Sequence, residues 1–157
     1  MVMRDETENV VELELLRAQR AQLASRLQAP WWYVAGVAVA LAAGSAVPIG
    51  SHYLTGGAVW CGLLFIVVFF LMEHALARAS GVAVGLGTWH YPSGRAGTIA
   101  MVAVMFANSV VEGSLLEHGL LAAAIVVAVL ATLAESGCWQ AHLRGIRRDL
   151  ETGRGAV

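Results

Sequence analysis

Long apolar runs separated by short polar stretches make up most of this chain. The longest run covers residues 58–77 and carries no charge in its first fifteen positions. About 20 consecutive apolar residues are enough for a helix to cross a bilayer. We therefore predict four membrane-spanning helices, at residues 31–50, 57–77, 96–113 and 117–140.

The first 29 residues are polar and follow a different pattern. Apolar side chains recur there at spacings near three and four, as in an amphipathic helix. They are Val10, Leu13, Leu16, Leu23 and Leu27. The segment has no apolar core of the kind that a cleavable signal peptide needs. We expect a cytoplasmic helix that leads into the first span, lies on the membrane surface or pairs with another copy.

The composition agrees with a chain that faces lipid. Hydrophobic residues make up 58% and charged residues 13%, whereas soluble domains have about 45–50% apolar and about 25% charged residues. The net charge of −1 offers no basic surface for nucleic acid. Cys61 and Cys138 have no metal-binding spacing and fall in different spans, so we expect neither a disulfide nor a metal site.

The arginines predict how the chain is oriented. All ten basic residues are arginines: four precede the first span, two lie between the second and third, and four follow the fourth. Basic residues are enriched in cytoplasmic loops. We therefore predict a multi-pass plasma-membrane protein with both termini cytoplasmic, residues 144–157 forming a tail that continues the fourth helix.

The expected fold is all-α, an integral membrane four-helix bundle of up-down-up-down topology over residues 30–143. Aromatic residues at 31–33 predict an interfacial belt where the first span begins. Pro48 is expected to kink or end that span.

Small residues on the first span predict a close helix contact. Gly36, Ala40 and Gly44 are spaced by four and would let a neighbouring helix approach. A bundle this small is also expected to work as a homo-oligomer, and this stripe offers an interface.

Two glutamates near the cytoplasmic ends of the second and fourth spans are the first candidates for chemistry. Acids inside a membrane are costly and often functional. If the two spans are neighbours, Glu73 and Glu135 could meet at similar depth and exchange protons or hold a cation. The alternative is that they reach water or pair with Arg78 and Arg144.

Further candidates surround these acids. One face of the fourth span carries Glu135, Cys138, Trp139 and His142, at i, i+3, i+4 and i+7. His74 follows Glu73 directly. Together these side chains could form a polar pocket that binds a ligand.

The third span carries a second polar group. Asn108 and Glu112 continue a stripe that begins with Met101 and Met105. Asn108 is expected to bond across helices, while Glu112 is expected to be wet at the outer surface with Glu117. Both are candidate ligand-binding residues. No histidine lies well inside an apolar span and no zinc-binding spacing occurs, so the sequence does not support haem or zinc and leaves any cofactor unknown.

The segment RLQAPWWY at 26–33, with four spans and Gly-Val-Ala-Val at 81–84, resembles a group of small actinobacterial membrane proteins. The resemblance implies four helices with cytoplasmic termini and carries no established function. Small multidrug transporters have a similar length and helix number, but they carry an acid in the first span, which this chain lacks.

Three functions remain open. The chain could bind or transport a small cationic or lipophilic molecule. It could instead be a membrane enzyme that uses Glu73 or Glu135 as an acid on an isoprenoid-like substrate, with aromatic rings lining the pocket. It could also be an accessory or regulatory subunit whose N-terminal helix binds a partner.

Overall fold

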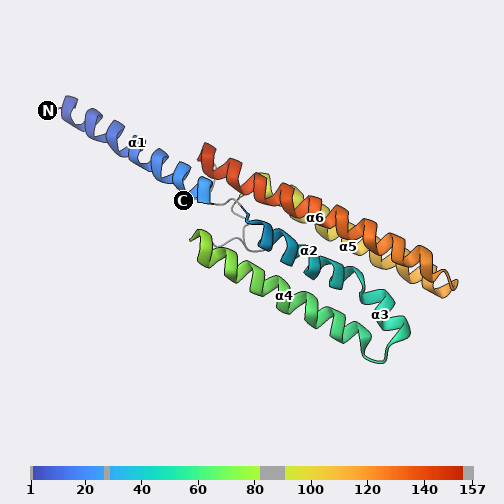
Figure 1. Cartoon of the computed structure of the whole chain (residues 1–157). Coiled ribbons are helices and arrows are strands. Elements are labelled where there is room, and N and C mark those ends of the chain that lie inside the picture. Colours follow the sequence, from blue (N-terminus) through green and yellow to red (C-terminus); the bar gives the residue numbers. More distant parts are fainter. Residues whose placement is uncertain (1, 27–28, 82–90, 154–157) are drawn as a thin grey trace.

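The structure, a computed structural model, is entirely helical over the residues it describes, which are 2–26, 29–81 and 91–153 (Figure 1). This confirms the all-α prediction. The helices are α1 (Val2–Arg26), α2 (Trp31–Ser45), α3 (Val47–Tyr53), α4 (Gly57–Ser80), α5 (Pro92–Glu117) and α6 (Leu121–Thr152). The middle linker of the predicted topology lies mostly outside the described residues, at 82–90.

Three helices, α4, α5 and α6, are long and apolar enough to cross a membrane. A fourth crossing exists if α2 and α3 form one span, with a bend of 44° between them. Pro48 lies in the first turn of α3, directly after the bend. A proline lacks the N–H that a continuous helix would need there, so the predicted kink is confirmed.

Most helix ends lie beyond the predicted spans, but the fourth helix begins at Leu121 and not at residue 117, and the first is interrupted after Ser45. The predicted turn at 51–57 shortens because α3 continues to Tyr53. The third predicted span, 96–113, is extended at both ends and reaches Glu117. The fourth helix continues through the predicted tail to Thr152, as its polar continuation suggested. Hydropathy finds only the apolar part of a helix and misses polar first and last turns.

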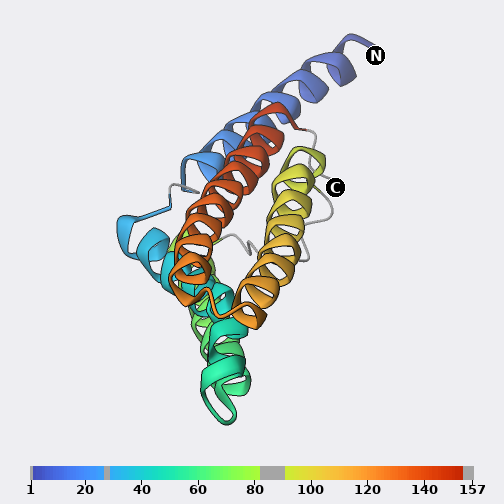
Figure 2. The ribbon, with the colours of Figure 1, turned by 90° about the vertical axis from the view of Figure 1, so that its right-hand side faces the viewer.

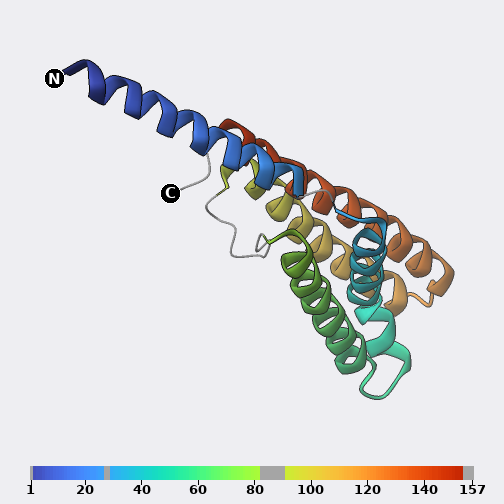
Figure 3. The ribbon, with the colours of Figure 1, turned by 60° about the vertical axis from the view of Figure 1, so that its left-hand side comes forward.

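The helix α2 lies at the centre of the arrangement. It packs against α4 and α6 and touches α5, while α5 and α6 run side by side over most of their length (Figures 1 and 2). The helix α4 packs on α2 and α3 and leans away from the α5–α6 pair (Figure 3). The closed four-helix bundle therefore stays a prediction.

The small-residue stripe of α2 is used inside the chain. A side chain added at Gly36 would overlap Met72, and one at Gly44 would come within 3.2 Å of Phe65. Both neighbours belong to α4, and Ala40 between them is fully buried. The stripe is thus occupied by α4 of the same chain and is not free as an interface between copies.

The last part of α1 packs beside the end of α6, and its first part extends beyond the other helices (Figures 1 and 2). Ala24 is buried there, whereas Val11 and Leu13 are exposed. The starts of α2 and α5 and the ends of α4 and α6 lie at the same end of the molecule as α1 (Figure 1). We name this the arginine end, because the described arginines of α4, α5 and α6 gather there.

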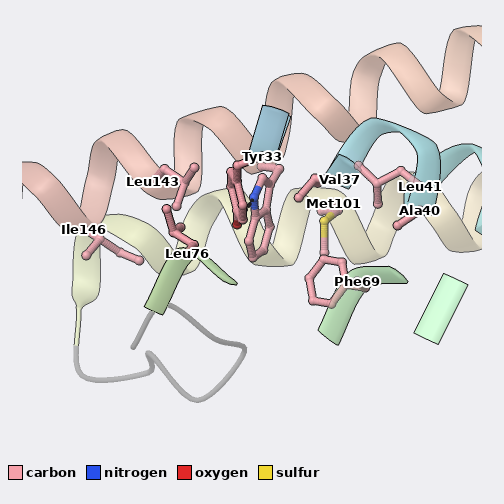
Figure 4. Close-up of a cluster of buried hydrophobic side chains, with 10 residues drawn as sticks. Tyr33, Val37, Ala40, Leu41, Phe69, Leu76, Met101, Leu143 and Ile146 are labelled. Carbon is pink, nitrogen blue, oxygen red and sulfur yellow. Dashed lines mark hydrogen bonds between the residues drawn. The ribbon is translucent and has the colours of Figure 1, made fainter. Parts of the chain in front are cut away.

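The apolar core joins α2, α4, α5 and α6 in the half of the molecule toward the arginine end (Figure 4). It consists of Tyr33, Val37, Ala40, Leu41, Phe69, Leu76, Met101, Trp139, Leu143 and Ile146. Large apolar side chains also cover the outside, among them Trp60, Phe70 and Phe106. Exposed apolar surface on this scale is typical of a face that contacts lipid.

Candidate functional site

Two glutamates are completely buried between α5, α6 and α2. Glu112 on α5 and Glu135 on α6 both have 0% exposure. A helical side chain leans toward the N-terminus of its own helix. Because α5 and α6 are antiparallel, the two side chains lean toward each other, and they are close enough to repel one another electrostatically. We name them the acid pair.

The acid pair has too few hydrogen-bond donors. The Ser45 hydroxyl donates to Glu135 Oε2 at 3.2 Å. Among the described residues, Glu135 Oε1 has no hydrogen-bond partner, and the Asn108 side chain is the group that interacts with the Glu112 carboxylate. The Asn108 carbonyl oxygen, one turn before Glu112, is also buried without a partner. Glu135 Oε1 and the Asn108 carbonyl oxygen are thus unpaired acceptors within the described part of the chain, and the Glu112 carboxylate has only a neutral partner, the Asn108 side chain.

No basic side chain in the described part of the chain forms an ion pair with Glu112 or Glu135. Burying even one carboxylate without a counter-charge is strongly unfavourable, and burying two close together is worse. The pair can persist in lipid only if it holds a proton or a bound cation. Carboxylate, amide and hydroxyl oxygens are suitable partners for a hard cation, an ammonium group or a shared proton.

An apolar groove lies where α5 meets α6, and neither Glu112 nor Glu135 is among its lining residues. It has a volume of about 280 Å³. Its walls are Val104, Ala107, Asn108, Val111, Val127, Leu130, Ala131 and Ala134. Asn108 is its one polar lining residue, and lies on the same face of α5 as Glu112. Asn108 is therefore the link between the groove and the acid pair.

A second polar cluster connects three helices nearer the arginine end. Tyr33 of α2 donates its hydroxyl proton to Glu73 Oε1 of α4 at 2.8 Å. The indole N–H of Trp139 on α6 donates to the Tyr33 oxygen at 3.0 Å. We name these three residues the Tyr33 network. Phe69 packs edge-on against Trp139 at 5.2 Å between ring centroids, so the network lies in the apolar core (Figure 4).

The prediction that Tyr33 belongs to an interfacial belt is wrong. Tyr33 has 0% exposure, whereas Trp31 is 82% exposed and remains at the surface. The physical reason is that Glu73 is buried and needs a donor, which the phenol supplies. Sequence analysis therefore missed Tyr33, and also Ser45. A search for hydroxyls on α2 that could serve the buried acids would have found both.

The structure separates the two glutamates that the sequence suggested as partners. Glu73 bonds Tyr33, and Glu135 bonds Ser45. Tyr33 and Ser45 are twelve positions apart on α2, which is about 18 Å along a helix axis. Neither glutamate pairs with an arginine among the described residues, and Arg144 instead bonds the Gln140 carbonyl.

Glu135 has a different neighbour from the one expected. Glu112, predicted to be wet, is fully buried and lies close to it. The structure thus brings together Asn108, Glu112 and Glu135, two of which the sequence had placed at opposite ends.

The remaining predicted site residues have other surroundings. His142 is buried, stacks on Trp139 at 4.9 Å and contacts the Gly94 carbonyl at 2.9 Å. It therefore ties α6 to the start of α5. Cys138 is half-buried, and His74 is exposed. Within the described ranges, no three His, Cys, Asp or Glu side chains lie close enough to hold a metal ion.

Comparison with protein-family models, with curated proteins and with solved structures finds no match to this chain. The acid pair and the Tyr33 network are therefore the features from which a function can be argued.

Proposed function

We propose that this chain binds and transports a small lipophilic cation, and that the acid pair holds the cationic group. One observation carries the proposal: Glu112 and Glu135 are both fully buried, without a basic partner among the described residues. A cation that enters the pair compensates the charge that the protein itself leaves uncompensated.

The apolar groove favours a lipophilic cation over a bare metal ion. Ligand pockets are largely apolar, with a few placed polar groups that fix orientation. Here the groove walls would hold the apolar body, and Asn108 together with the acid pair would orient the charged head. The size of the groove, about 280 Å³, suits a small molecule.

The proposed setting is the plasma membrane, crossed four times if α2 and α3 act as one span, with both termini in the cytoplasm. The clustering of the described arginines at one end supports this orientation. Because α4 leans away from α5 and α6, one chain does not enclose a path, and we propose that transport needs a homo-oligomer.

The Tyr33 network supports a second candidate function, an acid–base enzyme for a lipophilic substrate. Glu73 Oε2 is buried and has no hydrogen-bond partner among the described residues. The rings of Phe69 and Trp139 lie nearby and could stabilise a cationic intermediate. In this alternative Glu73, with Tyr33 beside it, would give or take a proton.

Equilibrium binding of radiolabelled tetraphenylphosphonium to the purified full chain in detergent tests the first proposal. We expect saturable binding that Glu112→Gln and Glu135→Gln each weaken at least about tenfold, since each removes the charge that pairs with the cation. Glu117→Gln is the matched control, because Glu117 lies on the same helix but is exposed. It should bind as the unaltered chain does.

Uptake into proteoliposomes then separates transport from binding. The unaltered chain should accumulate the same cation, and both acid-pair variants should not. Absence of saturable binding by the unaltered chain would refute the proposal. Retained binding in Glu112→Gln and Glu135→Gln, with loss in Glu73→Gln, would move the function to the Tyr33 network and favour the enzyme.

A further inference from the structure

A second hollow lies at the arginine end, between the first turn of α5 and the last turns of α6. It has a volume of about 400 Å³. Its lining residues are Ser93, Arg144, Gly145, Arg147, Arg148 and Glu151. Three arginines and one glutamate give this lining a net charge of +2, although the whole chain carries −1. We name it the arginine hollow.

The floor of the hollow is built by close packing of two helices. A side chain at Gly145 would come within 2.8 Å of the Gly94 nitrogen and overlap the Ser93 backbone. Asp149, fully buried, accepts hydrogen bonds from the Ser93 N–H at 2.8 Å and from the Ser93 hydroxyl at 2.6 Å. The start of α5 is therefore already capped, and Asp149 has its own donors.

Among the described residues, the three arginines of the hollow have no buried partner, unlike the start of α5, which bonds the buried Asp149. Arg144 and Arg148 are exposed, and the Arg144 Nε hydrogen bonds only a backbone carbonyl, that of Gln140. Arg147 pairs with Glu151 at 2.9 Å, but both side chains are more than 40% exposed. An exposed pair of this kind is weak. The hollow thus presents guanidinium groups to an incoming anion.

We infer that the arginine hollow binds the phosphate of an anionic phospholipid head group. It lies where the apolar helices α5 and α6 reach the arginine end, at the level of lipid head groups if these helices span the bilayer. Guanidinium groups bind phosphate oxygens through paired N–H donors. Basic pockets between membrane helices bind anionic lipids for this reason. The inference is independent of the proposed cation transport.

Native mass spectrometry of the full chain in mild detergent, titrated with palmitoyl-oleoyl phosphatidylglycerol, tests the inference. The matched zwitterionic probe is phosphatidylcholine with the same acyl chains. We expect the anionic lipid to bind with one preferred stoichiometry. The double variant Arg144→Gln/Arg148→Gln should weaken it about 30-fold, without changing the phosphatidylcholine affinity.

Arg78→Gln is the matched control, because Arg78 is exposed at the end of α4 and does not line the hollow. It should leave lipid binding unchanged. Arg144→Lys/Arg148→Lys keeps the charge but loses the paired donors, and should bind with an affinity between those of the unaltered chain and the glutamine variant. Circular dichroism should show the same helicity for every variant.

Three results would overturn the inference. Equal affinity of the unaltered chain for both lipids would show that no charge recognition exists. An equal loss in Arg78→Gln would show attraction to overall charge and not to this hollow. Displacement of the lipid by millimolar inorganic phosphate would assign the hollow to a free anion.

Discussion

At the residue scale, the acid pair shows why sequence alone misjudged Glu112. The predicted third span ended at residue 113, which put Glu112 at the water boundary. The helix instead continues to Glu117, so Glu112 lies more than one turn inside and is fully buried. The carboxylates themselves could be predicted as candidates from the sequence. Their partner could not, because pairing depends on the register between α5 and α6.

Repulsion between Glu112 and Glu135 should lower the free energy of unfolding of the unliganded protein. Replacing Glu112 by Gln removes the repulsion with Glu135 while keeping side-chain size. We expect the variant to raise the free energy of unfolding by about 1 kcal/mol, even as it loses ligand binding. Unfolding of the detergent-purified chain by sodium dodecyl sulfate, followed by circular dichroism, measures this. A destabilised Glu112→Gln would show that the pair is a structural element.

Removing a group from the Tyr33 network should destabilise the protein, in contrast to the change at Glu112. Tyr33→Phe removes the hydroxyl that accepts from Trp139 and donates to Glu73, and leaves both groups buried without a described partner. We expect the free energy of unfolding to fall by about 1–3 kcal/mol. The same denaturant titration tests this. Trp31→Phe, at an exposed ring in the same helix, is the control and should change stability little. Unaltered stability in Tyr33→Phe would contradict the hydrogen-bonded network.

At the element scale, hydropathy predicted the long apolar helices α4, α5 and α6, because a run of apolar residues is a property of the sequence itself. It could not predict which helices touch. Helix contacts depend on small residues at particular positions. Gly97 of α5 is one of them, because a side chain added there would lie 2.7 Å from the backbone nitrogen of His142 on α6. The close α5–α6 approach brings the Glu112 and Glu135 side chains within electrostatic range of each other.

A pair of glycines on α5 tests this packing. Gly97→Ala should destabilise the chain by about 1–3 kcal/mol because the methyl group meets backbone atoms of α6. Gly113→Ala on the same helix has open space around the added methyl group. It should be neutral or stabilising, since alanine has the higher helix propensity. Thermal unfolding of both variants in one detergent compares them, and equal effects would contradict close α5–α6 packing at Gly97.

At the scale of the whole molecule, the two ends differ in charge. The described arginines of α4, α5 and α6 lie at one end, and the α3–α4 and α5–α6 connections lie at the opposite end (Figure 1). Positively charged segments are retained in the cytoplasm during insertion. The proposed orientation therefore places the arginine hollow at the inner leaflet and the α3–α4 and α5–α6 turns outside.

Cysteine labelling in intact cells tests this orientation with positions that the structure exposes. In a background with Cys61→Ser and Cys138→Ser, Thr55→Cys marks the α3–α4 turn and Ala79→Cys marks the end of α4. A membrane-impermeant maleimide should label Thr55→Cys in intact cells, and Ala79→Cys only after permeabilisation. The inverse pattern would place the arginines outside, where the membrane surface carries less negative charge, and would remove the basis for an inner-leaflet lipid at the arginine hollow. Labelling of both positions from outside would mean that α4 does not cross the membrane, which would contradict the proposed four-span orientation.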